Sequence, residues 1–472
     1  MATLTFIAGM ERFNAHVWDE VAQALRAGGV GARLLRFNDD HVERRDPALA
    51  QAIGESDVVF VTLINMRSQA DWLAEQIGQA SPRAVFAFES MPEVMALNRV
   101  GEYRVQGGKG SLPKPMQLIL RLLTQGREED TLYAYTKLTK ITAKLLPLMP
   151  AKLHDFRTWL SVNIYWNQPD AANITQMIRL ILRDCLGQKL DVAPPRLIPM
   201  MGCFHPDSAE LFDGPEAYLK WQAKRRKSAA PRAKSQQPSA RLKHSGSDSS
   251  ALGLPTVALL AFRKHVVQQQ RYLGELVHTL EAQGLAVLPI FVSGIEAHVA
   301  VREWIARQPV DLILSTMGFP LVGGPAGSTK PGHYQQKASD MLAGIDVPYM
   351  VAQPLQMQTE QQWHEQGVAP MQAVIMYDLP EMDGSIAPVA LGAIRDQLIV
   401  ATPDRLERTA RQAAGWVRLR HTPPAEKKLA VVLYNYPPGL GKLGTAALLD
   451  VPASLLALLR RLRAEGYSVG EL

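Results

Sequence analysis

Cysteine is scarce in this sequence, and long apolar runs are missing. Only Cys185 and Cys203 occur among 472 residues, which fits a reducing cytoplasm and leaves a disulfide possible but unsupported. No stretch of about 18 uncharged apolar residues is present, so the sequence predicts no transmembrane segment. The N-terminus also lacks the basic region and the cleavage site of a secretory signal. We therefore expect a cytoplasmic protein.

Familiar catalytic patterns are missing as well. The sequence has no Ser-His-Asp order, no Cys/His zinc spacing and no paired catalytic carboxylates. The turn GLGKLGT, residues 439–445, is similar to a phosphate-binding loop, which requires Gly, four residues and then Gly-Lys-Ser/Thr. Here Leu443 occupies the hydroxyl position and Pro437 occupies the first glycine position. We therefore predict no ATPase site in this turn.

Two interpretations of the turn stay open. It is a tight strand-to-helix turn whose glycines adopt positive φ, or its amides contact a carboxylate ligand or a partner at the carboxyl edge of a sheet. On the second interpretation, Asn435, Gly441 and Lys442 are candidate contact residues.

Acidic residues are absent from residues 220–243, where nine lysines and arginines occur. Without those nine, 42 basic residues face 45 acidic ones, so the formal charge of +6 belongs to this segment. Residues 228–253 are rich in Ser, Ala, Pro and Gln, which predicts a flexible basic linker. A nucleic-acid or anionic-surface contact is disfavoured because no aromatic residues are interleaved. We predict no nucleic-acid partner.

Short β-branched runs alternate with helical stretches in residues 1–106 and again in residues 254–428. This alternation predicts parallel sheets, so we expect an α/β protein with doubly wound, Rossmann- or flavodoxin-like lobes. Residues 191–227 are expected to form a return strand and a turn. Residues 429–472 are expected to begin a further α/β unit that looks truncated, as if the chain were the front of something longer.

Residues 107–190 change to apolar spacings of three and four, as in Ile174, Ile178 and Ile181. This spacing predicts a helical insertion between the lobes. Core packing is the default interpretation of its aromatic residues, and a site for a flat ring is the alternative. These residues are Tyr133, Tyr135, Trp159, Tyr165 and Trp166.

Several further elements are expected from the apolar pattern. We predict strands over residues 195–204, 372–384 and 429–436 and at the end of the chain from Tyr467. We predict one helix from His265 to Gln283.

Three other stretches hold candidate site residues. His205 and Asp207 form a His-x-Asp pair that suits metal binding or the orientation of a carboxylate; alternatively, Asp207 or its neighbour caps a helix. Gly323 and Gly324 follow an expected strand, where open sheets bind ligands, or belong to a plain loop. Glu89 is either the N-terminal acid of a helix or a site residue at a strand end.

A set of phrases now points to a family. They occur in the order ESMPEVMALNRVGEY, GKGSLPKPMQLILRLL, NITQMIRLIL, GCFHPD, FPLVGGPA, DVPYMVAQPLQMQT, DLPEMDG and YPPGLGKLGTAALLDVPASL. Together they resemble the amino-terminal part of the porphyrin-binding large subunit of the magnesium chelatases, their H subunit, over essentially the whole chain. The later portion is also similar to the large subunit of cobaltochelatase, and the first block favours the magnesium branch.

The resemblance implies a part in the ATP-dependent insertion of Mg²⁺ into protoporphyrin IX, in chlorophyll or bacteriochlorophyll biosynthesis. It implies Mg²⁺ and protoporphyrin IX as substrates, no tightly bound cofactor, and AAA+ partner subunits, I and D, that use the ATP. We expect no catalytic or metal-binding residue in this segment. Contacts to porphyrin or partners are expected from Glu89, His205, Asp207, Gly323, Gly324, Asn435, Gly441 and Lys442.

Members of this family are much longer than 472 residues. Alone, the chain is therefore expected to be inactive and to bind porphyrin weakly or not at all. One alternative is a stand-alone tetrapyrrole-binding or carrier module without catalysis. A second is the cobaltochelatase large subunit of cobalamin biosynthesis.

Overall fold

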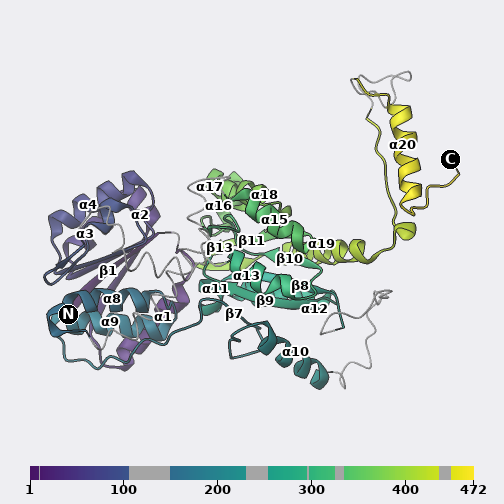
Figure 1. Cartoon of the computed structure of the whole chain (residues 1–472). Coiled ribbons are helices and arrows are strands. Elements are labelled where there is room, and N and C mark those ends of the chain that lie inside the picture. Colours follow the sequence, from purple (N-terminus) through teal and green to yellow (C-terminus); the bar gives the residue numbers. More distant parts are fainter. Residues whose placement is uncertain are drawn as a thin grey trace.

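The computed structural model describes residues 1–9, 11–105, 149–229, 253–294, 297–324, 334–434 and 448–471. Two mainly parallel sheets, each with helices on both faces, organise most of these residues into two lobes (Figure 1). The first lobe is the described part of residues 1–190, and the second is the described part of residues 200–421. The predicted α/β class with parallel sheets is confirmed.

The first lobe has a six-stranded sheet in the order β2-β1-β3-β4-β5-β6. The pairs from β2 to β4 are parallel, whereas β5 and β6 join antiparallel. The strands are β1 (Ala2–Ala8), β2 (Ala32–Asn38), β3 (Val58–Thr62), β4 (Ala84–Phe88), β5 (Arg99–Val100) and β6 (Tyr103–Arg104).

Helices cover both faces of this sheet because alternate strand residues point to opposite sides. On one face, Phe60 packs on Trp166, with ring centroids 4.6 Å apart, in a core shared by α1, α8 and α9. On the other face, Val59 and Val61 pack under α3 and α4. The helical segments are α1 (Ala15–Ala27), α2 (Asp39–Glu43), α3 (Pro47–Gly54), α4 (Arg67–Ala80), α5 (Pro92–Met95), η3 (Ala151–Leu153), α8 (His154–Trp166) and α9 (Ala171–Leu186).

Three of the five aromatic residues of the predicted helical insertion lie in described helices of the first lobe. Tyr165 and Trp166 are buried, and Trp159 packs against the same core. They are core residues of the first lobe, as the default interpretation predicts. Tyr133 and Tyr135 lie outside the described residues.

The second lobe has a sheet in the order β12-β11-β10-β8-β9-β7, in which β7 alone pairs antiparallel. The strands are β7 (Gly202–Cys203), β8 (Thr256–Phe262), β9 (Ala286–Val292), β10 (Leu312–Ser315), β11 (Tyr349–Gln353) and β12 (Ile386–Ala390). A hairpin of β13 (Gly392–Arg395) and β14 (Leu398–Ala401) follows.

Helices again lie on both faces of the second sheet. One core contains α12 and α19, and the other contains α10, α13 and α15. The helical segments are α10 (Pro215–Ala229), α11 (Arg263–Val267), α12 (Arg271–Ala282), α13 (Ala297–Glu303), η5 (Ile305–Arg307), α15 (Gln335–Ile345), α16 (Glu360–Gln366), α17 (Pro370–Ala373), the π-helix η6 (Val374–Asp378), α18 (Leu379–Met382), α19 (Pro403–His421) and η7 (Pro424–Glu426).

Two strand predictions in this lobe are wrong. Residues 372–382 are helical and residues 383–384 form a turn. Ile375, Met376 and Leu379 are buried at spacings of one and three rather than in alternation. Within residues 195–204 only β7 is a strand. The prolines Pro195 and Pro199 have no N–H to give to a ladder, which accounts for the shortened strand.

The predicted helix from His265 to Gln283 is broken into α11 and α12. The intervening residues are Gln268, Gln269 and Gln270, and Gln269 has a φ of 53°. The break brings the turn against the first lobe. There the Gln270 side-chain amide donates to the carbonyl of Phe13 at 3.0 Å, and Nε2 of His16 lies 2.7 Å from the carbonyl oxygen of Gln268.

The end of the chain differs from the second lobe. Residues Leu429–Tyr434 form neither strand nor helix and are exposed. Helix α20 (Val451–Ala464) buries no residue and projects away from the lobes in Figure 1. The strands predicted over 429–434 and 467–471 are therefore wrong, since no described strand lies beside them to pair their backbone groups.

Over the described ranges, the structure contains no helix that is both long enough and apolar enough to cross a bilayer.

Candidate functional site

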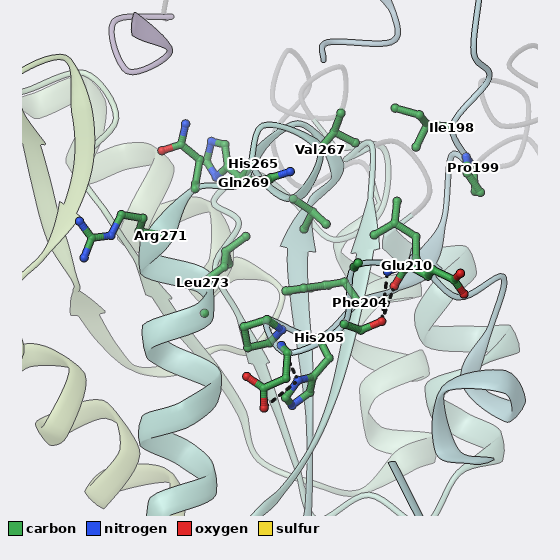
Figure 2. Close-up of a pocket in the computed structure, with 18 of the residues that line it drawn as sticks. Ile198, Pro199, Phe204, His205, Glu210, His265, Val267, Gln269, Arg271 and Leu273 are labelled. Carbon is green, nitrogen blue, oxygen red and sulfur yellow. Dashed lines mark hydrogen bonds and ion pairs between the residues drawn. The ribbon is translucent and has the colours of Figure 1, made fainter. Parts of the chain in front are cut away.

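A pocket of about 1120 Å³ lies on the second lobe at the start of α12. Its walls come from three segments: residues 196–199, the turn 204–211, and residues between His265 and His278, a segment that includes the break between α11 and α12. Figure 2 shows Ile198 and Pro199 on one side of the opening, Arg271 on the other, and Val267 and Phe204 between them. The volume is slightly above the usual range of about 300–1,000 Å³ for small-molecule sites.

Apolar and polar side chains contribute almost equally to the lining of the pocket. Phe204, Val266 and Leu273 are buried wall residues. The side chain of Arg271 is 85% exposed, and its nearest acid is Glu275 at 3.7 Å. Such a lining suits a large ligand that carries both apolar and polar groups.

His205, predicted as a site residue, belongs to the pocket wall formed by residues 204–211. Its side chain is fully buried. The backbone N–H of Asp207 donates to Nδ1 at 3.1 Å, so the other ring nitrogen carries the hydrogen. Nε2 then donates to Oε1 of Glu281 at 3.3 Å. Both nitrogens are engaged, and this leaves neither free for a metal.

Asp207 does not cap a helix, because no helix begins before Pro215 in this part of the described chain. Instead its carboxylate accepts a hydrogen bond from Nη2 of Arg225 at 2.5 Å and lies 3.0 Å from Nε2 of His278. Partial burial alone would raise the pKa of Asp207. Hydrogen bonds and charge from His278 and Arg225 outweigh burial and lower the pKa.

Glu281 is the centre of this network and was missed from the sequence. Arg225 contacts both of its oxygens, and the Gln222 amide donates to Oε1 at 2.9 Å. Burial opposes ionisation, but hydrogen bonds from His205, Arg225 and Gln222 lower the pKa of Glu281 far below its ordinary value. The carboxylate is therefore ionised at neutral pH.

The network ties α10 to α12 beneath the pocket. Trp221 of α10 packs on His205 with ring centroids 4.9 Å apart, and the Arg225 guanidinium lies 5.8 Å from the Trp221 ring. Arg225 is one of the nine basic residues of the segment 220–243, and it lies in helix α10 of the second lobe. The spacing of three between His278 and Glu281 puts both side chains on one helix face, and this was the pattern in the sequence that could have pointed to Glu281.

Glu89 lies elsewhere, at the carboxyl end of β4 in the first lobe. It has a φ of 48° and precedes α5, whose first-turn acid is Glu93. The helix N-terminal role therefore belongs to Glu93. Desolvation by neighbouring protein raises the pKa of Glu89.

Gly323 and Gly324 follow β10 with φ values of 86° and 52°. Neither they nor Glu89 line the pocket beside His205. Near them the backbone N–H of Leu321 donates to the buried Asp383 at 2.5 Å. Burial raises the pKa of Asp383 to about 6, although this hydrogen bond opposes the shift. Sequence reasoning did not single out Asp383.

The remaining predicted contacts, Asn435, Gly441 and Lys442, lie outside the described residues. Among the residues that are described, no group of three or more His, Cys, Asp and Glu side chains is arranged to hold a metal ion.

Two family models together match nearly the whole chain. Residues 163–472 match the family described as CobN/Magnesium Chelatase. Residues 3–160 match a domain of unknown function, DUF3479. The boundary between the two matches falls within α8 of the first lobe.

Named relatives agree with the first of these matches. The magnesium-chelatase H subunit of Chlorobaculum parvum is 45% identical over 99% of this chain, and the match covers 35% of that protein. The magnesium-chelatase H subunit of Rhodobacter capsulatus is 28% identical over 81% of this chain and 31% of its own length. The aerobic cobaltochelatase subunit CobN of Pseudomonas aeruginosa is 28% identical over 65% of this chain and 23% of its length.

A solved structure, the catalytic subunit of cobaltochelatase from Mycobacterium tuberculosis, aligns with 99% of this chain and 31% of its own. The TM-score is 0.49 at 20% identity. This chain spans about a third of the length of the relatives that it matches. By the family match over residues 163–472 and the identity to the magnesium-chelatase protein of C. parvum, the chain belongs to the CobN/magnesium chelatase family.

Proposed function

We propose that this chain is the amino-terminal part of a magnesium chelatase porphyrin-binding subunit, which supports ATP-dependent insertion of Mg²⁺ into protoporphyrin IX. The 45% identity to a magnesium-chelatase H subunit over 99% of the chain supports this most directly. In this proposal the protein acts in the cytoplasm, in chlorophyll or bacteriochlorophyll biosynthesis, and binds no nucleic acid.

Coverage favours the magnesium branch over the cobalt branch. The relatives named for magnesium chelatase match between 81% and 99% of this chain. Those named for cobaltochelatase match 65% and 46%. The difference is consistent with a first lobe that belongs to the magnesium branch. We further propose that both lobes are doubly wound, on the basis of their strand orders and two-sided helix cover.

The pocket on the second lobe is the proposed place of contact with the macrocycle. A porphyrin is a flat apolar ring with carboxylates at its edge, and the mixed lining of the pocket includes apolar side chains and an exposed Arg271. His205 and Asp207 would act indirectly, by holding the wall 204–211. Glu89, Gly323, Gly324, Asn435, Gly441 and Lys442 remain proposed contacts to porphyrin or partners.

The energy source is proposed to lie in partner subunits, the AAA+ subunits I and D, which would use the ATP. Mg²⁺ gives up its water reluctantly, so coupling a porphyrin holder to a separate motor is physically sensible. Mg²⁺ and protoporphyrin IX are substrates here, and no tightly bound cofactor is proposed.

Titration of the purified chain with deuteroporphyrin IX, followed by quenching of tryptophan fluorescence, tests this proposal. The pocket narrows the expectation of weak or absent binding to weak, saturable binding. Val267→Glu should reduce it at least tenfold, because a carboxylate is placed beside the apolar side chains of the lining. Leu419→Glu is the matched control, since Leu419 is 47% exposed on α19 and does not line the pocket. Absence of saturable binding, or equal losses in both variants, would reject the pocket as the porphyrin site.

A further inference from the structure

Residues 263–270, which form α11 and the break before α12, contact both the pocket and the first lobe. Val266, Val267 and Gln269 line the pocket of the second lobe. Lys264, Gln268 and Gln270 of the same stretch contact the first lobe. Gln270 does both, because it also lines the pocket. A shift of this stretch therefore changes the pocket and the lobe contact together.

An ion pair between Lys264 and Glu11 also crosses between the lobes. Glu11 follows β1, and its side chain is only 2% exposed. Its second oxygen accepts from the Asn14 side-chain amide at 3.0 Å, so the carboxylate is held from its own lobe. Lys264 also lies 5.6 Å from the Trp166 ring. Replacement of either partner leaves the other charge uncompensated, so a single substitution at this pair should destabilise the docked arrangement of the lobes.

Arg263, the neighbour of Lys264, binds the pocket wall formed by residues 196–199. Its guanidinium is buried and donates to the carbonyls of Pro199 at 2.7 Å and Ile198 at 3.0 Å. It also donates to the carbonyl of Asn167 at 2.8 Å, at the end of α8 in the first lobe. The first lobe, α11 and the 196–199 wall are thus joined through one side chain.

We propose that docking of the first lobe and binding in the pocket are coupled through α11, with Glu11, Lys264 and Arg263 as positioning residues. The proposal rests on the proposed function for the identity of the ligand. Coupling is reciprocal: a docked first lobe holds the pocket walls in the binding arrangement, and a bound ligand stabilises the docked lobe. None of the three side chains needs to touch the ligand.

Deuteroporphyrin IX binding and backbone hydrogen exchange, measured on the whole chain, test the coupling together. Glu11→Gln and Lys264→Met should each weaken binding about three- to tenfold and speed exchange over residues 263–270. Lys264→Arg keeps the charge and should restore most of the affinity. Ligand added to the wild type should slow exchange over the same residues.

Asp184→Asn is the matched control. Asp184 is a buried carboxylate of the first lobe, bound by Thr158 at 2.9 Å and Arg183 at 2.6 Å, away from α11. This variant should lower stability and leave porphyrin affinity unchanged.

Each outcome decides something. Faster exchange at α11 with unchanged affinity in Glu11→Gln and Lys264→Met overturns the coupling and leaves the proposed function intact. An equal loss of affinity in Asp184→Asn also overturns it, since general destabilisation would then explain the effect. Failure of the wild type to bind deuteroporphyrin IX counts against the proposed function. In that case hydrogen exchange still tests the coupling: unaltered exchange over residues 263–270 in Glu11→Gln and Lys264→Met rejects the positioning role.

Discussion

Arg225 and Glu281 form a two-point ion pair, with Nη1 2.9 Å from Oε1 and Nη2 3.1 Å from Oε2. The two side chains come from α10 and α12, which are far apart in the sequence. Paired geometry of this kind gives a stronger contact than a single charged hydrogen bond. It fixes the floor of the pocket, because His205 and Asp207 are bound to the same two partners.

Removal of the arginine should therefore be costly. Arg225→Met leaves Glu281 and Asp207 with fewer donors, and we expect a loss of about 2–3 kcal/mol in the free energy of unfolding, measured by urea denaturation. The control is Arg271→Met, because Arg271 is 85% exposed and lies 3.7 Å from Glu275; less than about 0.5 kcal/mol should be lost there. Equal effects in the two variants would show that the network adds no stability.

The same pair has a predictable pH dependence. The folded-state pKa of Glu281 is depressed, so its contribution is complete above the ordinary glutamate pKa of about 4.3 and is lost as the pH falls below it. Glu281→Gln should thus cost a constant amount between about pH 5.5 and 7, and progressively less below about pH 4.5. Urea denaturation of both proteins across this range measures the difference. A cost that grows on acidification would contradict the assigned sign.

Asp383 should show the opposite dependence. Its folded-state pKa is raised to about 6, so the folded protein holds a proton that the unfolded chain releases. Stability then falls as the pH rises from about 4 to 6 and stays low above it. Asp383→Asn should be more stable than the wild type at about pH 7.5, by about 1–3 kcal/mol, and equal to it near pH 4. Thermal unfolding at the two pH values tests this, and equal differences at both would refute it.

The sheets were predictable from local patterns, whereas the site, which depends on distant partners, was predictable only in part. Strand and helix alternation predicted both sheets, because each strand is a run of buried apolar residues such as Val58–Thr62. His205 and Asp207 were singled out, but their partners Arg225 and Glu281 lie 18 or more residues away in the chain. Tertiary packing alone brings these charges together.

The break at Gln268–Gln270 was missed for a different reason. No glycine or proline marks it, and apolar residues at Leu273, Leu276 and Leu280 continue the helical period beyond it. The contacts that stabilise the break come from Phe13 and His16, more than 250 residues earlier. A local pattern holds no information on such partners, whereas the strand error at 429–434 arose because a strand needs a neighbour as well as a sequence.

ATP hydrolysis should be absent from the purified chain. The expectation rests on the sequence of the turn 439–445, in which Leu443 replaces the hydroxyl that a phosphate-binding loop uses for its metal. A coupled assay with excess Mg²⁺ should give no turnover above buffer, and Lys442→Ala should leave the result unchanged. Turnover that disappears in Lys442→Ala would place a nucleotide site in this turn and reject our interpretation of it.

Gly318, which follows β10, tests how tightly the carboxyl edge of the second sheet is packed. A Cβ added there would lie 2.7 Å from the carbonyl oxygen of Ile375 and 2.9 Å from Nε2 of Gln353. Backbone cannot yield as a side chain can, so Gly318→Ala should lose about 1–3 kcal/mol in the free energy of unfolding. Gly415→Ala is the control, because Gly415 lies inside α19 with nothing within 4 Å of its added Cβ; it should gain about 0.5–1 kcal/mol from helix propensity. Urea denaturation of the two variants gives opposite signs if the edge is packed in this way, and a neutral Gly318→Ala would mean that the loop after β10 can move away from η6.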